Sequence, residues 1–373
     1  MALSERVVGQ SSAVSAIVPY VQMHQAGLAP EGRPAGVFLL LGPSGTGKTR
    51  TVEALAHVLH GSEKNLLKVD CGEFQMEHEV AKLIGAPPGY LGHRETQPML
   101  TQQKLAAVAS ERSNLSIVLF DEIEKAAPSM NRLLLGVLDK AALRLGDNTT
   151  VNFERSLIFL TSNLGSRDML RAIQPDFGFQ AAGPMALPGL PKKLQGIGLA
   201  AVKRKFSPEF VNRIDVVVTY QPLDAGALEE ILEQQLAQLQ EHIINRLGPR
   251  GFRLALTAES RRLLLRLGTS PQYGARELKR TLHRHLTQQL AALLAAGEIE
   301  PGSDVRVDIN EDGDGLAIET ARSLNRMKEP VPQRAASGVA AEPSSRTCNV
   351  SETLTCSRAK TSSRKRTSVE ARR

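Results

Sequence analysis

The chain is poor in cysteine, in aromatic residues and in long apolar runs. Its 373 residues include three cysteines, no tryptophan and 4% aromatic residues. The cysteines form no Cys-x-x-Cys pair, which argues against a disulfide framework and favours a reducing compartment. The first residues lack the apolar stretch of a signal peptide, and no run of about 18 apolar residues occurs. We therefore expect a cytoplasmic protein that does not contact a membrane.

Positive charge is concentrated at the C-terminal end. The chain carries a formal net charge of +7, but residues 322–373 alone hold 12 Lys and Arg against 4 Asp and Glu. The remaining residues therefore carry a net charge of −1, which gives no support to a nucleic-acid-binding core. Ser, Thr, Pro and basic residues dominate the end of the chain, so we expect a disordered basic tail at residues 321–373. We favour a solvated extension without function for this tail, and binding to nucleic acid or an acidic partner is the alternative.

A complete phosphate-binding loop lies between an apolar run at residues 37–41 and a helical pattern at residues 51–59. Its members are Gly42, Pro43, Ser44, Gly45, Thr46, Gly47, Lys48 and Thr49. A strand, a glycine turn and a helix are the context that this motif needs, because backbone amides and the helix N-terminus converge on phosphate oxygens. We expect Lys48 to reach the β- and γ-phosphates and the Thr49 hydroxyl to hold Mg²⁺. The sequence therefore predicts binding of a nucleoside triphosphate.

Two further apolar strands end in polar residues that suit this chemistry. Residues 116–120 run into Asp121 and Glu122, and residues 156–161 run toward Asn163. Open α/β sheets bind ligands at the carboxyl ends of their parallel strands. We expect Asp121 in the shell of the Mg²⁺ ion and Glu122 to activate the water that attacks the γ-phosphate. Asn163 could hydrogen-bond the γ-phosphate or that water, and a simple turn asparagine is the alternative.

Two arginines follow helix-start signals farther along the chain. Ser207 and Pro208 cap and begin a short helix, and Arg213 lies just beyond its first turn. An arginine placed there can stabilise transition-state charge, although spacing alone favours a surface salt bridge. Arg276 opens a helix of the second domain, from which it could report the nucleotide state to that domain.

Alternating strands and helices predict an α/β fold with a parallel sheet that is covered on both faces. The predicted strands are residues 37–41, 66–70, 116–120, 156–161 and 216–219. Amphipathic helices then predominate, so we divide the chain into a nucleotide-binding domain at residues 1–222, a smaller, mostly helical C-terminal domain at residues 223–320, and the tail. Residues 308–319 have the spacing of a calcium-binding EF-hand loop. Because both flanks alternate like strands, we predict a hairpin there instead.

The order and spacing of these motifs resemble the C-terminal ATPase module of the Clp-type AAA+ chaperones, the ClpB/ClpC/ClpA group of protein unfoldases. The match covers about residues 4–310 and includes the segments 6–10, 33–34, 42–49, 83–92, 121–126, 161–163, 206–215 and 274–276. The resemblance implies a P-loop AAA+ large domain followed by a helical lid. It also implies a role for each of five residues: Val7 and Val8 line the adenine pocket, Asn163 is sensor 1, Arg213 is a finger that acts across a subunit boundary, and Arg276 is sensor 2.

Tyr90 is the most informative residue of the segment 83–92. Gly and Pro on both sides hold its ring on a loop that cannot continue a helix or a strand. Taken alone, such a ring is often buried locally. By resemblance it lines a central pore and grips an extended polypeptide, for which a rigid aromatic ring offers contact area that tolerates many sequences.

The resemblance implies an ATPase that uses ATP and Mg²⁺, assembles as a homo-oligomer in a hexameric ring, and threads or pulls unfolded or aggregated polypeptides. The alternative is a scaffold or regulator that is switched by nucleotide and does not thread polypeptides. Residues 93–96 and 139–145 depart from the family pattern. In the family these segments border the central channel, so the departures affect the expected substrate handling more than the expected ATP chemistry. Residues 177–179 and 197–199 are candidate tripeptides for docking a peptidase. The first begins with an aromatic residue and the second lies close to a predicted helix, so docking stays open and we favour its absence.

Overall fold

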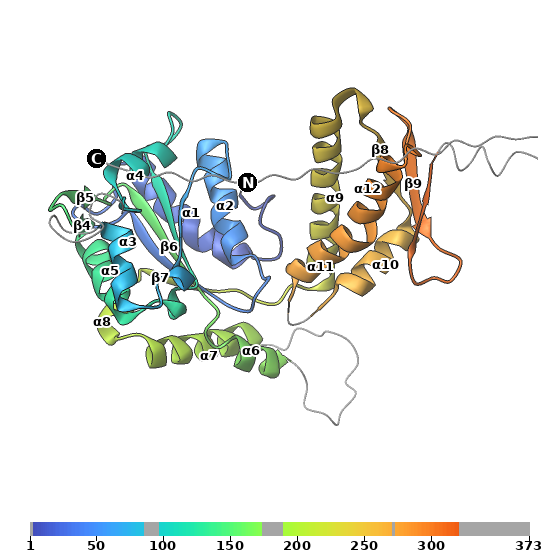
Figure 1. Ribbon diagram of the computed structural model, residues 1–373. Coiled ribbons are helices and arrows are strands. Elements are labelled where there is room, and N and C mark those ends of the chain that lie inside the picture. The colour runs from blue at the N-terminus through green and yellow to red at the C-terminus, as the bar shows by residue number, and fades with distance from the viewer. Residues whose placement is uncertain (1–2, 86–96, 174–188, 271–272, 321–373) are drawn as a thin grey trace, which may run out of the picture. The chain divides into compact units, whose positions relative to one another are not determined.

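Five parallel strands form the central sheet of the computed structural model, which describes residues 3–85, 97–173, 189–270 and 273–320 (Figure 1). The strands are β1 (Gly36–Leu41), β2 (Leu67–Asp70), β3 (Ser116–Asp121), β6 (Ser156–Ser162) and β7 (Val216–Thr219). Their order is β2-β3-β6-β1-β7, and all neighbouring pairs are parallel. Each strand agrees with its predicted range to within one residue at either end. The predicted parallel α/β sheet is therefore confirmed.

Alternate residues of the strands serve two separate apolar cores. Phe38 and Leu40 pack in a core with α1 (Ser11–Gln25) and α2 (Lys48–His60). Leu39 and Leu41 pack in a second core on the other face, with α5 (Pro128–Lys140) and α7 (Leu190–Lys205). Helices thus cover both faces of the sheet (Figure 1). Burial on both faces explains why the sequence of β1 is a continuous apolar run and does not alternate with polar residues.

Strand order brings the predicted site segments to one edge of the sheet. β6 lies between β1 and β3, so the segments that follow these three strands are neighbours. They are the phosphate-binding loop after β1, Glu122 after β3 and Asn163 after β6. All three strands run parallel, and therefore these segments lie at the same, carboxyl edge.

A separate apolar core is built by residues from Leu228 to Leu316. Its helices are α9 (Ala225–Leu247), α10 (Ala258–Gly268), α11 (Ala275–Leu282) and α12 (Gln288–Ala295), and they accompany a sheet of β8 (Arg253–Leu256), β9 (Asp304–Ile309) and β10 (Leu316–Glu319). β9 and β10 pair antiparallel, which confirms the hairpin predicted at residues 308–319. β8 pairs in parallel with β9 and was not predicted from the sequence. The helical C-terminal part is confirmed, and the division between residues 222 and 223 stays a prediction.

Shorter elements connect these parts. They are α3 (Val80–Ile84), α4 (Gln102–Val108), the hairpin of β4 (Ala142–Arg144) and β5 (Thr150–Asn152), α6 (Ser166–Ile173) and α8 (Pro208–Val211). The tripeptide at residues 197–199 lies inside α7, where Gly198 is buried and packs near Met169 and Leu41. Tyr90, residues 177–179 and the tail lie outside the described residues. Within the described ranges, no helix combines the length and the apolar character that crossing a membrane requires.

Candidate functional site

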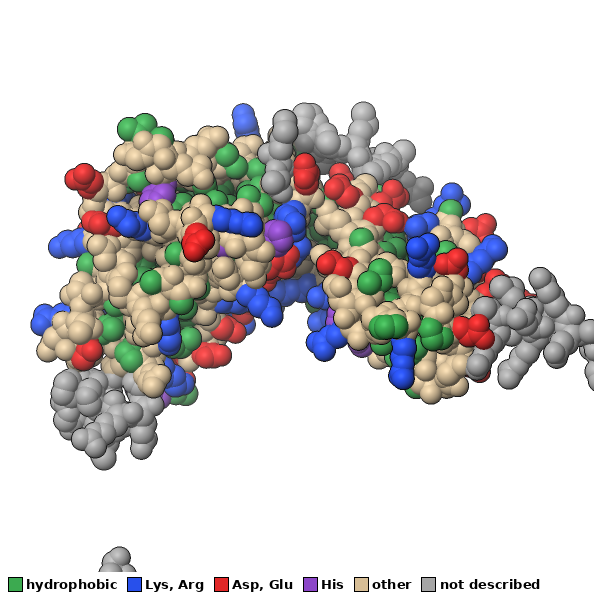
Figure 2. All heavy atoms as spheres, turned by 90° about the horizontal axis from the view of Figure 1, so that it is seen from above, with side chains coloured by type: hydrophobic (Ala, Val, Ile, Leu, Met, Phe, Trp, Pro, Cys, Tyr) green, Lys and Arg blue, Asp and Glu red, His purple; other side chains and the backbone are tan. Residues whose placement is uncertain are grey.

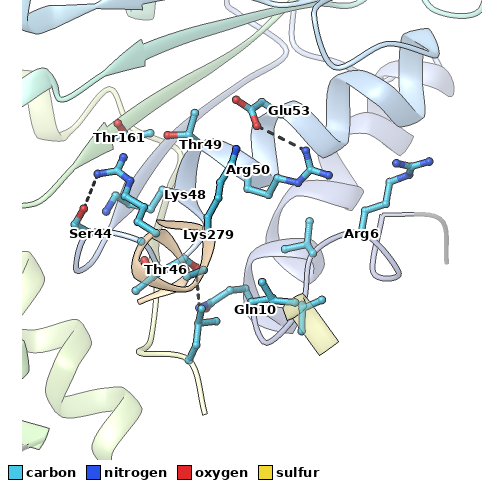
Figure 3. A pocket seen from close by; sticks show the side chains of 18 of the residues that line it. Arg6, Gln10, Ser44, Thr46, Lys48, Thr49, Arg50, Glu53, Thr161 and Lys279 are labelled. Carbon is cyan, nitrogen blue, oxygen red and sulfur yellow. Dashed lines mark hydrogen bonds and ion pairs between the residues drawn. The ribbon is translucent and has the colours of Figure 1, made fainter. Parts of the chain in front are cut away.

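A cavity of about 390 Å³ lies at the carboxyl edge of the sheet (Figure 3). Cavities of about 300 to 1,000 Å³ are typical of small-molecule sites. Its walls come from the phosphate-binding loop, the segments after β3 and β6, the N-terminal residues, α9 and α11. Of the predicted site residues that the structure describes, all line the cavity except Gly42, Pro43 and Arg213. The fold therefore brings together residues that are up to 269 positions apart in the chain, from Val7 to Arg276.

The phosphate-binding loop turns on glycines with left-handed backbone angles. Gly45 has φ +77° and Gly47 has φ +99°, values that residues with a Cβ rarely adopt. A Cβ on Gly45 would also lie 2.0 Å from the carbonyl oxygen of Tyr273. The backbone amide of Ala275, at the start of α11, donates to the Gly45 carbonyl at 3.1 Å. The loop thus approaches α11 so closely that only glycine fits at position 45.

Lys48 is a buried cation at the first position of α2. Its side chain is 8% exposed, and Nζ donates to the carbonyl oxygens of Gly42 (2.7 Å) and Pro43 (2.9 Å) and to Oδ1 of Asn163 (2.8 Å). Burial lowers the pKa of Lys48 to about 8, against the opposing effect of the Glu124 carboxylate. A group whose burial disfavours its charge gains most from an anion placed beside it. The ammonium group therefore fits a phosphate at this position.

Asp121 lies beside the Thr49 hydroxyl, which is 3.5 Å from its Oδ1. The Thr161 hydroxyl donates to Oδ1 at 2.5 Å, and the Lys68 ammonium lies 2.9 Å from Oδ2. Burial raises the pKa of Asp121, but these two partners outweigh it, so the pKa lies below its ordinary value. An ionised carboxylate and a hydroxyl are the hard oxygen ligands that Mg²⁺ takes in P-loop sites.

The predicted Mg²⁺ position is not surrounded by protein ligands alone. No group of three His, Cys, Asp or Glu side chains that could hold a metal occurs in the part of the chain that the structure describes. Mg²⁺ commonly keeps one or two protein ligands and completes its shell with phosphates and water. Thr49 and Asp121 match that donor set, so the predicted residues fit the ion.

Glu122 and Asn163 meet above the sheet edge. Glu122 has φ +57°, a conformation that costs energy for a residue other than glycine, and its amide donates to the Thr161 hydroxyl at 3.0 Å. The Asn163 amide nitrogen donates to Oε1 of Glu122 at 3.3 Å, while Oε2 is paired with Lys125. Since Oδ1 of Asn163 also accepts from Lys48, this side chain joins the cation to the carboxylate. Such a contact is more specific than that of a turn asparagine.

The N-terminal residues and the start of α9 close the other end of the cavity. Val7 is buried and Val8 is half-buried, and with Leu223 and Ile231 they make this end apolar. Gln10 is 3% exposed, and its Nε2 donates to the carbonyl oxygens of Thr46 (3.2 Å) and Gln221 (2.8 Å). Figure 3 shows the contact between Gln10 and Thr46. Sequence reasoning gave Gln10 no role, because its partners become neighbours only in the folded chain.

The two predicted arginines have different surroundings. Nη1 of Arg276, in α11, donates to the Ser44 hydroxyl of the phosphate-binding loop at 2.6 Å. Nη1 of Arg213 lies 2.6 Å from Oδ1 of Asp139, and the two side chains are 43% and 31% exposed. Arg213 therefore makes the salt bridge that spacing alone favours and does not line the cavity of its own chain. Its action across a subunit boundary stays a prediction.

The cavity is also lined by charged residues that the sequence analysis did not select. Arg50 pairs with Glu63 at 2.7 Å and with Glu53 at 3.8 Å, and Arg6 and Lys279 also contribute to the wall. Outside the cavity, Lys and Arg side chains are interspersed with Asp and Glu on the face shown in Figure 2. A face of mixed sign agrees with the near-neutral charge of the chain before its tail.

Comparison with known proteins matches both parts of the described chain. Residues 33–217 match the family described as AAA domain (Cdc48 subfamily), and residues 223–307 match the C-terminal, D2-small domain of ClpB protein. Chaperone protein ClpB of Corynebacterium diphtheriae is 40% identical over 319 residues, which are 86% of this chain and 33% of that protein. Chaperone protein ClpB of Pseudomonas putida is 40% identical over 310 residues, which are 83% of this chain and 33% of that protein. The chain thus spans about a third of the length of the curated relatives it matches.

A solved structure is also similar. The closed-state cryo-EM reconstruction of Hsp104 with ATPγS and FITC casein has a TM-score of 0.71 and 29% sequence identity to this chain. The alignment covers 85% of this chain and 50% of that one. The likeness therefore shows a shared fold over most of this chain.

Proposed function

The chain belongs to the AAA domain family (Cdc48 subfamily) with a D2-small domain of the ClpB type, and from this premise we propose that it binds ATP with Mg²⁺ and hydrolyses it. One observation carries the proposal. Lys48 and Glu122 project into one cavity and share Asn163 as a hydrogen-bonding partner. A phosphate-binding cation and a carboxylate that can activate water are thereby held at a fixed separation, as phosphoryl transfer requires.

The cavity supports the following binding roles, together with the family resemblance. The loop amides and Lys48 hold the β- and γ-phosphates, and Arg276 reaches the same loop from α11 through Ser44. Thr49 and Asp121 would hold Mg²⁺, which would supply positive charge beside the phosphate oxygens. Val7 and Val8, at the apolar end, contact the adenine.

Hydrolysis uses the carboxylate and the amide. The water oxygen bonds to the γ-phosphorus while the bond from that phosphorus to the bridging oxygen breaks, which yields ADP and phosphate. Glu122 accepts the proton that the water loses. The Asn163 amide orients the water beside Glu122, with which it already shares a hydrogen bond. Oε2 of Glu122 is also paired with the Lys125 ammonium.

We further propose that the chain works in a hexameric ring on unfolded or aggregated polypeptides. Support comes from relatives named Chaperone protein ClpB and from the similarity to Hsp104, whose reconstruction contains casein. The exposed position of Arg213, away from its own cavity, suits a residue that completes the site of a neighbouring subunit. Tyr90 is assigned to the pore. Cytoplasmic location is retained as part of the proposal, and docking of a peptidase stays open.

ATP turnover tests the catalytic part of the proposal. The Glu122→Gln variant should bind ATP as the wild type does and hydrolyse it about 10² to 10⁴ times more slowly, because it keeps the shape but loses the base. Glu111→Gln makes the same chemical change at an exposed residue outside the cavity and should be fully active. If the wild type hydrolyses no ATP with Mg²⁺ at any concentration, with or without an unfolded protein, the proposal is wrong.

Client handling needs a separate measurement, because a nucleotide-switched scaffold also hydrolyses ATP. Tyr90→Ala should abolish unfolding of a tagged fluorescent reporter and leave ATP turnover within about twofold, because the aromatic grip is lost and the ATP site is not. Tyr90→Phe keeps the ring and should keep the unfolding activity. A reporter that the wild type never unfolds favours the scaffold. A reporter that Tyr90→Ala unfolds as well as Tyr90→Phe would show that the aromatic ring is not the grip.

A further inference from the structure

One face of α9 turns toward the cavity. Its cavity-lining residues are Ile231, Gln234, Gln235 and Gln238, which are spaced i, i+3, i+4 and i+7 and so share one side of the helix. Leu228, Leu232 and Leu236 instead pack in the apolar core of the C-terminal part. The cavity face of α9 therefore begins with an apolar residue and continues with three amide side chains.

Gln235 differs from its neighbour on this face. Nε2 of Gln234 donates to the Glu5 carbonyl at 3.1 Å, so that amide has a partner in the protein. Oε1 of Gln235 is buried and accepts no hydrogen bond from any residue that the structure describes. Buried amide oxygens in folded proteins nearly always have a donor. Because Gln235 is one of the residues that line the cavity, a bound ligand is a source for that donor.

The position of Gln235 shows which part of a nucleotide supplies that donor. The loop and Lys48 mark the phosphate end of the cavity. Ile231 lies one helical turn before Gln235 and belongs to the apolar end, where a flat base finds contact area. Adenine carries an amino group at its 6-position, whereas guanine and hypoxanthine carry a carbonyl oxygen there. An oxygen acceptor beside this position therefore pairs with the amino group of adenine.

We propose that Gln235 selects the base, with Oε1 accepting a hydrogen bond from the 6-amino group of adenine. This inference rests on the proposed function, because it names a contact that the same cavity makes with the base of ATP. The preference arises from burial, because a base without the 6-amino group leaves the buried Gln235 oxygen without a donor.

The test compares ATP with purine riboside 5′-triphosphate, which lacks only the 6-amino group. Binding is measured by calorimetry in the Glu122→Gln background, so that neither ligand is consumed. We expect ATP to bind about tenfold more tightly than the analogue when Gln235 is present. Gln235→Leu should weaken ATP about tenfold, leave the analogue within about twofold, and so remove the discrimination. Gln288→Leu, the same change at an exposed position on α12, should leave the preference for ATP in place.

Each other outcome overturns the inference in a recognisable way. If Gln235→Leu weakens ATP and the analogue equally, the residue acts only by packing. If ATP binds more tightly than 2′-deoxy-ATP to the parent but equally tightly to Gln235→Leu, the oxygen accepts from a ribose hydroxyl and not from the base. If the protein with Gln235 binds both ligands equally tightly, base selection fails while the ATP site stands, and if it binds neither, the proposed function fails as well. The unfolding midpoint of Gln235→Leu should equal or exceed that of the parent, since an unpartnered buried oxygen is removed.

Discussion

The nucleotide-free protein should become more stable as pH rises from about 8 toward 10.5, because of Lys48. Burial lowers the pKa of its ammonium group from 10.5 to about 8. In this pH window the unfolded chain still holds the proton that the folded chain has released, so raising the pH favours folding. The lowered pKa corresponds to about 3 kcal/mol in total, of which about 2 kcal/mol should be gained between pH 7 and pH 9.5.

Urea unfolding of the wild type and of Lys48→Met at several pH values isolates this contribution. Methionine fills the space without a group that titrates, so the stability profile of the variant lacks the contribution of Lys48. Tyr20, Cys71 and Tyr220 titrate with the opposite sign, because burial raises their pKa values and the folded state loses stability as the unfolded chain deprotonates. Their effects cancel in the difference between the two proteins.

That difference in unfolding free energy should rise by about 2 kcal/mol between pH 7 and pH 9.5 in favour of the wild type. Saturating ATP with Mg²⁺ should suppress the rise, because an anion beside Lys48 restores its proton. Parallel stability profiles for the two proteins without nucleotide would refute the burial of a proton-releasing lysine in the loop.

Two more substitutions test the geometry of the site. Gly45→Ala should weaken ATP binding at least about tenfold, because its φ of +77° and the Tyr273 carbonyl leave no room for a Cβ. Calorimetry measures the affinity for ATP. In the control variant Gly196→Ala the added Cβ meets no atom within 4 Å, so this variant should bind ATP normally. Equal affinities of Gly45→Ala and the wild type would show that the loop adapts. Thr161→Val removes the hydroxyl between Asp121 and the Glu122 amide and should slow turnover about tenfold or more while raising the Mg²⁺ requirement, as steady-state kinetics would show. Thr161→Ser keeps the hydroxyl and should restore both, and a fully active valine variant would exclude this positioning role.

Residues whose role follows from local context were predictable from the sequence. The central strands β1, β3 and β6 are largely apolar runs, as burial on both faces of a sheet requires. The loop at residues 42–49 carries its own strand and helix context, so its place at the carboxyl edge follows directly. Asp121 ends β3 of the same sheet and Glu122 follows it, so their place at the carboxyl edge follows for the same reason.

Residues whose role depends on distant contacts were not predictable. Thr161 looks like an ordinary strand threonine, and only the parallel pairing of β3 with β6 brings its hydroxyl to Asp121. Gln10 acts through Gln221, a partner 211 positions away. The four residues of β8 alternate too briefly to distinguish a strand from a loop, and the pairing with β9 defines them. Amide side chains such as Gln235 carry no motif, because their meaning lies in an unpartnered atom that only the fold creates.

The claim that ATP is cleaved at a site shared by adjoining subunits is tested most directly by mixing two inactive variants. Arg213→Ala keeps Glu122 but lacks the finger, and Glu122→Gln keeps the finger but lacks the base. In a head-to-tail ring formed from equal amounts of both, about a quarter of the junctions join an intact Glu122 to an intact Arg213. Each variant alone should hydrolyse almost no ATP, and the mixture should recover up to about a quarter of the wild-type rate. A mixture that stays as inactive as its components, although sedimentation shows mixed rings, would contradict the shared site.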